Sequence, residues 1–201
     1  MIAGLIPAAG HSRRMGRPKL ALPLRGRPLL AHVVAALREG GADPVLVVLG
    51  AHVADLAEVA RAAGAEALVL EAPTPDMRAT IERGLSWLEA RWMPADDDAW
   101  LLAPGDHPTL DASLVRRLIE SRRDHPEASI IVPTHEGKRG HPALIAWRHV
   151  AGLRAHRRDE GINAYLRLHA DTTLELTAGP SAVEDVDTPE DYERLRAAFG
   201  Q

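Results

Sequence analysis

The stretch PVLVVLG, residues 44–50, decides the fold class, because it is a continuous apolar run with no alternation of polar side chains. Strands of this kind are buried on both faces, as in a parallel sheet covered by helices on each side. The flanking sequence fits this arrangement. Residues 28–39 repeat Leu and Val at helical spacing, and residues 52–63 form a second predicted helix that ends at Gly64. We therefore expect the strand at 44–50 to lie between helices in an α/β protein.

The same alternation of short apolar runs and helical patterns extends in both directions. Further strands are expected at 2–6, 66–71, 99–103 and 128–133, and further helices at 77–92, after Asp111 and from Pro189 onward. At the last helix, Thr188 is the predicted N-cap, Pro189 occupies N1 and Asp191 occupies N3. The pattern predicts a three-layer, doubly wound, mostly parallel sheet of Rossmann-like type. No linker or composition shift divides the chain, so we expect one domain over residues 1–201.

Composition argues against several classes of function. The 24 Lys and Arg residues against 28 Asp and Glu give a net charge of −4, which disfavours a non-specific nucleic-acid binder. The chain has no cysteine, which excludes disulfides and thiolate chemistry and fits a cytoplasmic protein. The apolar residues 1–10 follow no basic segment and are too short to cross a bilayer, so neither a signal peptide nor a membrane segment is expected. The absence of H-E-x-x-H and G-x-S-x-G leaves zinc proteases and serine hydrolases without support.

The loop after the first strand, AAGHSRRMGRPK at residues 8–19, is typical of a phosphate-binding segment. Gly10 and Gly16 let the backbone approach a ligand closely, and four cations accompany them: Arg13, Arg14, Arg17 and Lys19. The spacing matches neither the P-loop nor G-x-G-x-x-G. A solvated, charged surface loop is the alternative interpretation.

Two acidic segments could complement this loop. Asp106, in PGDHP, directly follows the strand at 99–103, where it could hold a divalent metal against phosphates or simply stabilise a turn. In VEDVDTPED, Asp185 and Asp187 alternate on a predicted extended stretch, so either could meet Asp106 across a metal. Because Thr188 already caps the following helix, we favour Asp187 as the second metal ligand and keep Asp185 in reserve.

Together, AAGHSRRMGRPK, PGDHP and DVDTPED resemble the motifs of the nucleotidyltransferase superfamily that includes the molybdenum cofactor cytidylyl- and guanylyltransferases. The resemblance extends over essentially the whole chain and is closest to the cytidylyltransferase branch. It implies the nucleotidyltransferase fold and transfer of CMP, or another NMP, to a phosphorylated acceptor with Mg²⁺ and release of pyrophosphate. The Ala-Ala-Gly at residues 8–10 resembles the pyrimidine-using relatives, so CTP is preferred, and molybdopterin is the preferred acceptor.

The resemblance also assigns roles to residues by position. The resemblance implies that the nucleotide is contacted by Ala8, Ala9, Gly10, Ser12, Arg14, Lys19 and Thr80. It implies catalytic roles for Arg14, Lys19 and Asp106, and Mg²⁺ binding by Asp106 and Asp187. It implies that the acceptor is contacted by Arg139, Gly140 and His141. Asp76, Arg78 and Ala79 depart from the family's Gly, Ser and Ser, so we expect a different base pocket or acceptor pocket. A monomer is expected, and a molybdoenzyme that receives the product is a further implied partner. Two alternatives stay open: a sugar-phosphate or phospho-alcohol nucleotidyltransferase, and a non-catalytic nucleotide-binding chaperone for the cofactor.

Overall fold

An eight-stranded sheet forms the centre of the molecule in the computed structural model, which describes residues 1–199. Its strands are β1 (Ile2–Ala8), β4 (Val45–Gly50), β5 (Glu66–Leu70), β6 (Ala99–Leu102), β7 (Ile130–His135), β8 (Lys138–Arg139), β9 (Ala143–Ala146) and β10 (Thr173–Thr177). They lie in the order β10-β7-β9-β6-β1-β4-β5, with β8 beside β7. Only β8 and β9 run antiparallel to their neighbours within this sheet of the described chain, so the prediction of a mostly parallel sheet is confirmed.

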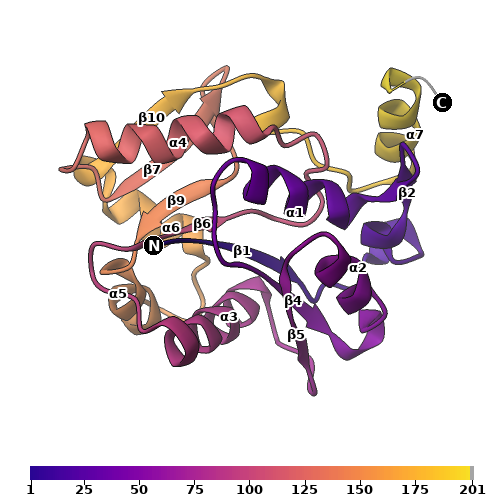
Figure 1. The fold of residues 1–201 in the computed structure, drawn as a ribbon, viewed down its shortest axis with the longest axis horizontal. Helices are drawn as coiled ribbons and strands as arrows, with labels where there is room; N and C mark the ends of the chain where they lie inside the picture. The colour runs from indigo at the N-terminus through magenta and orange to yellow at the C-terminus, as the bar shows by residue number, and fades with distance from the viewer. Residues whose placement is uncertain (200–201) are drawn as a thin grey trace.

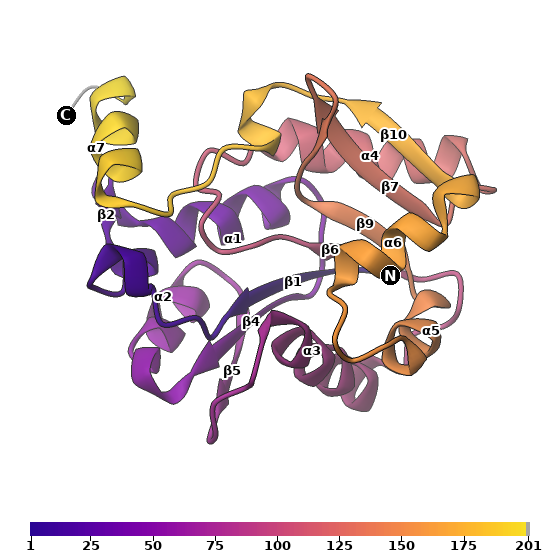
Figure 2. The same cartoon turned by 180° about the vertical axis from the view of Figure 1, so that it is seen from behind.

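Helices cover both faces of the sheet (Figures 1 and 2). One face carries α1 (Leu29–Glu39), α2 (Leu56–Ala62) and α4 (Ala112–Asp124). The other carries α3 (Met77–Trp92), α5 (His149–Ala155) and α6 (Ile162–Leu168). The last helix, α7 (Pro189–Ala198), lies apart from both layers, where it packs with the small hairpin of β2 (Pro23–Leu24) and β3 (Arg27–Pro28). The three-layer arrangement expected from the sequence is therefore present.

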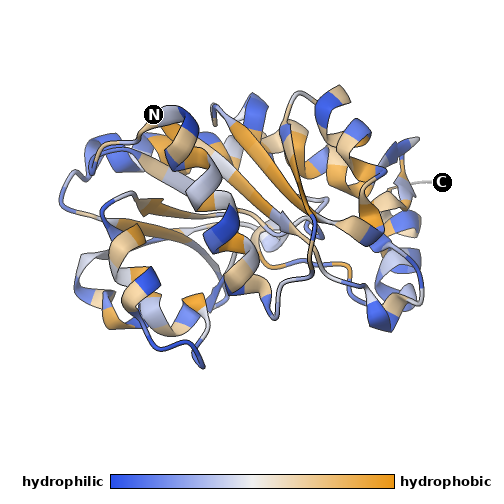
Figure 3. Cartoon of the chain, turned by 90° about the horizontal axis from the view of Figure 1, so that it is seen from below, coloured by the Kyte–Doolittle hydropathy of each residue, from blue (hydrophilic) through white to orange (hydrophobic). Residues whose placement is uncertain are grey.

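The side chains of β4 explain why its apolar run is unbroken. Val47 and Leu49 pack into the core beneath α1, α2 and α4, whereas Leu46 and Val48 pack against α3 on the opposite face. All four are fully buried, and each buried side chain of this size contributes about 1.5–3 kcal/mol. Figure 3 shows the same layering as orange strands enclosed by helices with blue outer surfaces. At Gly84 of α3, a Cβ atom would lie 2.5 Å from Leu5 Cδ1, so glycine is what allows this helix to pack closely against β1.

Several elements differ from the sequence-based expectation. The helix expected at 52–63 starts only at Leu56, after a 3₁₀ turn, and the strand expected at 128–133 runs over Ile130–His135. The segment around Asp185 and Asp187 forms no strand and the two carboxylates line different cavities, so the prediction that both lie on one face of a strand is wrong. Its backbone is held instead by a hydrogen bond from Val186 N–H to the Asp106 carbonyl, 2.9 Å.

Both predicted helix caps are confirmed. Asp111 accepts a hydrogen bond from Ser113 N–H at 2.7 Å at the start of α4. Thr188 and Asp191 form a reciprocal capping box at the start of α7, with Pro189 at its first position. No helix within residues 1–199 is long and apolar enough to cross a membrane.

The strand order reverses next to β1. The chain places β4 and β5 on one side of β1 and then returns to place β6 on the other. Ligands in such sheets bind beyond the carboxyl ends of the strands at this reversal point. The loop 9–22 and the loop 103–111 leave β1 and β6 there, and the hydrogen bond at Asp106 brings the segment before α7 to the same place.

Candidate active site

A cavity of about 290 Å³ opens where these three segments meet. It is lined by Pro7, Ala8, Gly10, Ser12, Arg13, Arg14, Lys19, Leu20, Met77, Pro104, Gly105, Asp106 and Asp187. The cavity thus brings together the cationic loop and two acidic residues that the sequence analysis had singled out separately. Ala9 and Thr80 do not line it. Arg13, which occupies a variable position of the family motif, does.

The cationic loop has a defined conformation rather than that of a loose surface segment. Ser12 adopts φ 47° and Gly16 φ 66°, both in the left-handed region, which explains the glycine at position 16. The Ser12 hydroxyl accepts a hydrogen bond from Lys19 N–H at 3.3 Å, which closes the loop on itself. Between them, the Met15 side chain is buried in a cluster with Tyr192 of α7. The loop is therefore fixed at both ends and anchored in the middle.

Lys19 lies between the two carboxylates. Its Nζ donates to Asp106 Oδ2 at 2.6 Å and to Asp187 Oδ1 at 2.8 Å, and its side chain is only 14% exposed. Burial acts to lower the pKa of Lys19, but the charges and hydrogen bonds of Asp106 and Asp187 outweigh it, so this pKa is raised. Arg14 pairs with the other oxygen of Asp187 at 2.7 Å. The hydrogen bond from Lys19, aided by Arg14, lowers the pKa of Asp187, so both partners stay charged at neutral pH.

The paired carboxylates fit a divalent cation. Mg²⁺ is commonly bound by one or two protein carboxylates, with water and substrate phosphates completing its shell. Asp106 and Asp187 already converge on one positive charge, the Lys19 ammonium. Residues 1–199 contain no group of three or more His, Asp or Glu side chains that could enclose a metal unaided. Asp106 and Asp187 would therefore hold the ion jointly with the phosphates of a nucleotide.

Asp185 does not line the cavity that contains Lys19 and Asp106. It lines a different cavity, beside α7, together with Ser181 and Leu195. Burial raises the pKa of Asp185, and the negative charges of Asp187 and Asp106 raise it further. It is Asp187, therefore, that meets Asp106 at Lys19.

Thr80 is placed differently from a base-contacting residue. Its side chain is 3% exposed within the first turn of α3. The hydroxyl donates to the Asp76 carbonyl at 3.2 Å and shares a hydrogen bond of 2.6 Å with the Thr74 hydroxyl. These contacts stabilise the start of the helix, so the role of Thr80 in nucleotide binding stays a prediction.

Arg78, one of the departures from the family pattern, uses its donors on backbone carbonyl groups and on Glu82. Its Nη2 donates to the Leu153 carbonyl at 2.6 Å and the His156 carbonyl at 2.9 Å, and its Nη1 to the Glu160 carbonyl at 3.0 Å. Its Nε donates to Glu82 at 3.0 Å, and the guanidinium is only 6% exposed. Arg78 therefore fastens the segment between α5 and α6 to α3, and this segment lines a further cavity with Met77 and His141. No sequence pattern signalled that role.

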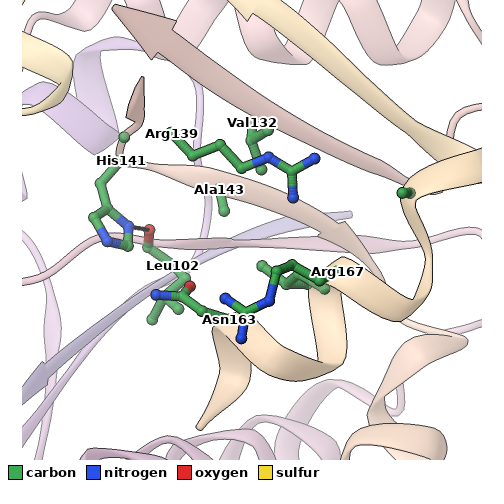
Figure 4. A pocket seen from close by; sticks show the side chains of 10 residues that line it. Leu102, Val132, Arg139, His141, Ala143, Asn163 and Arg167 are labelled. Atoms are coloured by element: carbon green, nitrogen blue, oxygen red, sulfur yellow. Dashed lines mark hydrogen bonds between the residues drawn. The ribbon is translucent and has the colours of Figure 1, made fainter. Parts of the chain in front are cut away.

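A second cavity has a volume of about 330 Å³ (Figure 4). The three residues of the predicted acceptor loop, Arg139, Gly140 and His141, all line it. At Gly140 a side chain would collide with the carbonyl group of Ala182, so only glycine fits. The structure therefore groups this loop around a cavity distinct from the first one.

Two buried histidines lie between Asp106 and the second cavity. His141 Nδ1 donates to the Leu102 carbonyl at 3.3 Å, and its ring meets His107 edge-on with centroids 5.3 Å apart. Burial, with a further contribution from His107, lowers the pKa of His141 to about 4, and burial also lowers the pKa of His107. Both rings are therefore neutral at neutral pH. His107 Nε2 lies 3.9 Å from Asp106 Oδ1, and the sequence analysis had assigned this residue no role.

Known proteins match this chain over nearly its full length. A curated relative, nicotine blue oxidoreductase of Paenarthrobacter nicotinovorans, is 30% identical, and the match covers 96% of each chain. The solved structure of a homologue of the Mycobacterium tuberculosis protein Rv0371c, from Mycobacterium sp. strain JC1, has a TM-score of 0.81 at 29% identity and covers 98% of this chain and 96% of that one. Rv0371c itself, solved in complex with manganese, has a TM-score of 0.74 at 26% identity and covers 98% of both chains.

The family model of the MobA-like NTP transferase domain matches residues 4–173. This range contains the cationic loop, Asp106 and the acceptor loop, and it stops before Asp187. Because the match spans most of the sequence, and the sheet and both cavities are arranged as described, the chain belongs to the MobA-like NTP transferase family of nucleotidyltransferases.

Proposed function

We propose that this protein transfers CMP from CTP to a phosphorylated acceptor and releases pyrophosphate, with molybdopterin as the preferred acceptor. The observation that carries the proposal is the position of Lys19, which lies between Asp106 and Asp187 at the reversal point of the sheet. A site for a metal-bound triphosphate needs cations for the phosphates and carboxylates for the metal in one place. The preference for CTP is supported by the Ala-Ala-Gly at residues 8–10.

In the proposed reaction, a phosphate oxygen of the acceptor forms a bond to the α-phosphorus of CTP. The bond from the α-phosphorus to the bridging oxygen breaks, and pyrophosphate leaves with the electron pair. Lys19 and Arg14 would neutralise the charge that grows on this leaving group. Gly10 would let backbone amides approach the phosphates. Mg²⁺ held by Asp106 and Asp187 would supply Lewis-acid stabilisation of the phosphoryl oxygens when bound.

No general base is needed when the attacking group is an ionised phosphate. This agrees with the two buried histidines near Asp106, because burial lowers the pKa of His107 and of His141 and so makes both rings weaker bases than a free imidazole. Catalysis then consists of positioning and of electrostatic stabilisation. The manganese complex of Rv0371c supports a divalent metal in this family.

Pyrophosphate release tests the proposal directly. Purified protein with Mg²⁺, molybdopterin and each of CTP, GTP and UTP should release pyrophosphate with CTP. Turnover only with sugar phosphates or phospho-alcohols would replace the acceptor assignment, and nucleotide binding without turnover would favour a cofactor chaperone. Asp106→Asn keeps the shape of the side chain but removes its charge, and it should lower the rate about a hundredfold or more. Asp97→Asn, at an exposed carboxylate on a distant loop, is the matched control and should leave the rate unchanged.

Oxidoreduction is a second candidate function, because the relative that matches 96% of this chain is named nicotine blue oxidoreductase. In that case a nicotinamide nucleotide would bind at the cationic loop through its pyrophosphate, and the dye would occupy the acceptor cavity. Oxidation of NADH or NADPH on addition of nicotine blue, without pyrophosphate release, would establish this candidate and overturn nucleotidyl transfer.

A further inference from the structure

The acceptor-side cavity carries more positive charge than the predicted acceptor loop supplies. It is lined by Leu102, Val132, Arg139, Gly140, His141, Ala143, Asn163, Leu166, Arg167 and Ala170, which come from β6 to β9 and from α6 with the turn that follows it. Figure 4 shows the guanidinium groups of Arg139 and Arg167 facing the same open space, with Asn163 beside Arg167 and His141 further along. The aliphatic side chains form the floor. Arg167 and Asn163 were absent from the sequence-based site.

The positive charges of Arg139 and Arg167 are only partly neutralised. Arg139 uses its Nε for Glu175, at 2.9 Å, and its side chain is 36% exposed. The Arg167 side chain is exposed, and within residues 1–199 it forms neither a hydrogen bond nor an ion pair. His141, which also lines the cavity, is neutral because burial lowers its pKa to about 4. The two guanidinium groups thus share one ion pair, that of Arg139 with Glu175.

We infer that Arg139 and Arg167 bind a second anionic group of the acceptor, an oxyanion, separate from the phosphate that attacks CTP. A guanidinium presents parallel N–H donors that match phosphate oxygens, and two of them match a dianion better than a single carboxylate. The Asn163 amide adds a neutral donor at the same opening. The acceptor is then a molecule with two anionic ends.

Three cavities share lining residues between Asp106 and the arginine pair Arg139 and Arg167. A third cavity is lined by Met77, Arg78, Leu102, His141 and Asn163, among others. Met77 also lines the cavity of Lys19 and Asp106, whereas Leu102, His141 and Asn163 also line the arginine cavity. A single ligand can therefore extend from Asp106 along the segment held by Arg78 to the arginine pair. This assignment rests on the proposed function for its acceptor, but the anion site itself can be tested alone.

Inorganic phosphate is the probe, and the readout is NMR of the arginine Nε–H resonances in isotope-labelled full-length protein. Saturable shifts of the Arg139 and Arg167 resonances are expected. Arg167→Gln should weaken binding at this site about tenfold, because it removes one charged hydrogen-bonding partner. Arg123→Gln, at an exposed arginine of α4, is the matched control and should bind as the wild type does. Thermal melting checks that both variants fold, and Arg167→Lys should recover part of the affinity.

Shifts confined to Arg14, or equal phosphate affinity in Arg167→Gln and the wild type, would overturn the inference. The two proposals also fail separately. Phosphate binding at Arg139 and Arg167 without pyrophosphate release would sink nucleotidyl transfer and leave the anion site standing. Pyrophosphate release with an acceptor KM unchanged in Arg167→Gln would sink the second anionic contact instead.

Discussion

Replacing Lys19 should make the free protein a better metal binder, although it removes a residue that the reaction is proposed to need. In the wild type, a divalent ion that binds Asp106 and Asp187 must first displace the Lys19 ammonium, which donates to them at 2.6 and 2.8 Å. Hydrogen bonds to charged groups are worth about 1.5–3 kcal/mol each. The carboxylates are 21% and 26% exposed and the freed ammonium regains water, so we take a net cost of about 2 kcal/mol for the pair. That cost corresponds to about thirtyfold in Kd.

The assay is Mn²⁺ binding in the absence of nucleotide, followed by calorimetry or by the electron paramagnetic resonance signal of free Mn²⁺. Lys19→Met should lower the Kd for Mn²⁺ about thirtyfold relative to the wild type. Arg17→Met is the matched control, because Arg17 belongs to the same loop but lies 6.0 Å from the centre of the Tyr192 ring and does not contact either carboxylate. It should change the Kd by less than about twofold.

With CTP present, the wild type should bind Mn²⁺ more tightly than Lys19→Met does. In the wild type, Lys19 can then donate to the triphosphate and leave both carboxylates to the metal. The Met variant has no ammonium group that could bind the triphosphate in this way. The variant should also melt at a lower temperature without metal, because Arg14 is then the only cation paired with the two carboxylates, and Mn²⁺ should restore more stability to it than to the wild type. An equal Mn²⁺ Kd for Lys19→Met and the wild type, with both folded, would refute the idea that ammonium and metal compete for the same oxygens.

Two further predictions concern stability. Arg78→Leu should lower the free energy of unfolding by about 3 kcal/mol, since it leaves four buried or part-buried carbonyl groups without this donor and leaves Glu82 with Arg158 alone. Urea unfolding measures this, and Arg83→Leu, at an exposed position of the same helix, should stay within about 0.5 kcal/mol of the wild type. The hydrogen bond from Thr188 and further donors lower the pKa of Asp191 from 3.8 to about 2, so its contribution to stability is complete above the ordinary pKa and is lost as the pH falls towards 2. Urea unfolding across acidic pH should therefore show a flatter pH dependence for Asp191→Asn than for the wild type, and parallel curves would contradict the capping role.

The parts of the fold that the sequence predicted are those whose signal is local. The run at β4 could be recognised because both faces of that strand are buried, and α3 was predicted at its observed bounds because its apolar residues keep helical spacing. The four-residue β9 was missed, since a short apolar segment between antiparallel neighbours carries no pattern of its own. The strand β10, at an edge, is only half buried and was missed for a similar reason.

The candidate site shows the same division between local and distant information. The cationic loop and Asp106 each stand out in a short motif, but the contacts of Lys19 join positions 87 and 168 residues apart, which no local pattern contains. Asp187 was favoured because Thr188 already served as a helix cap. The structure supplies partners for Asp187 by a different route, through a segment that forms no strand and brings its carboxylate to Lys19 and Arg14. Arg167 gave no signal, because a lone arginine on a short helix is ordinary until Arg139 is placed opposite it.

The long separation between Lys19 and Asp187 also sets an order of events during synthesis. The cationic loop leaves the ribosome early, and Asp187, the second carboxylate partner of Lys19, follows 168 residues after Lys19. At typical rates of elongation this delay is on the order of ten seconds. Through that interval, Asp106 is the only one of the two carboxylates that can have been made, and a chain interrupted before residue 187 would contain the cationic loop with one of the two carboxylate partners of Lys19. The helix α7 is made last, and its Tyr192 then packs on Met15 of the cationic loop and donates to the Pro23 carbonyl at 2.5 Å. The loop is therefore held in place only when synthesis is nearly complete.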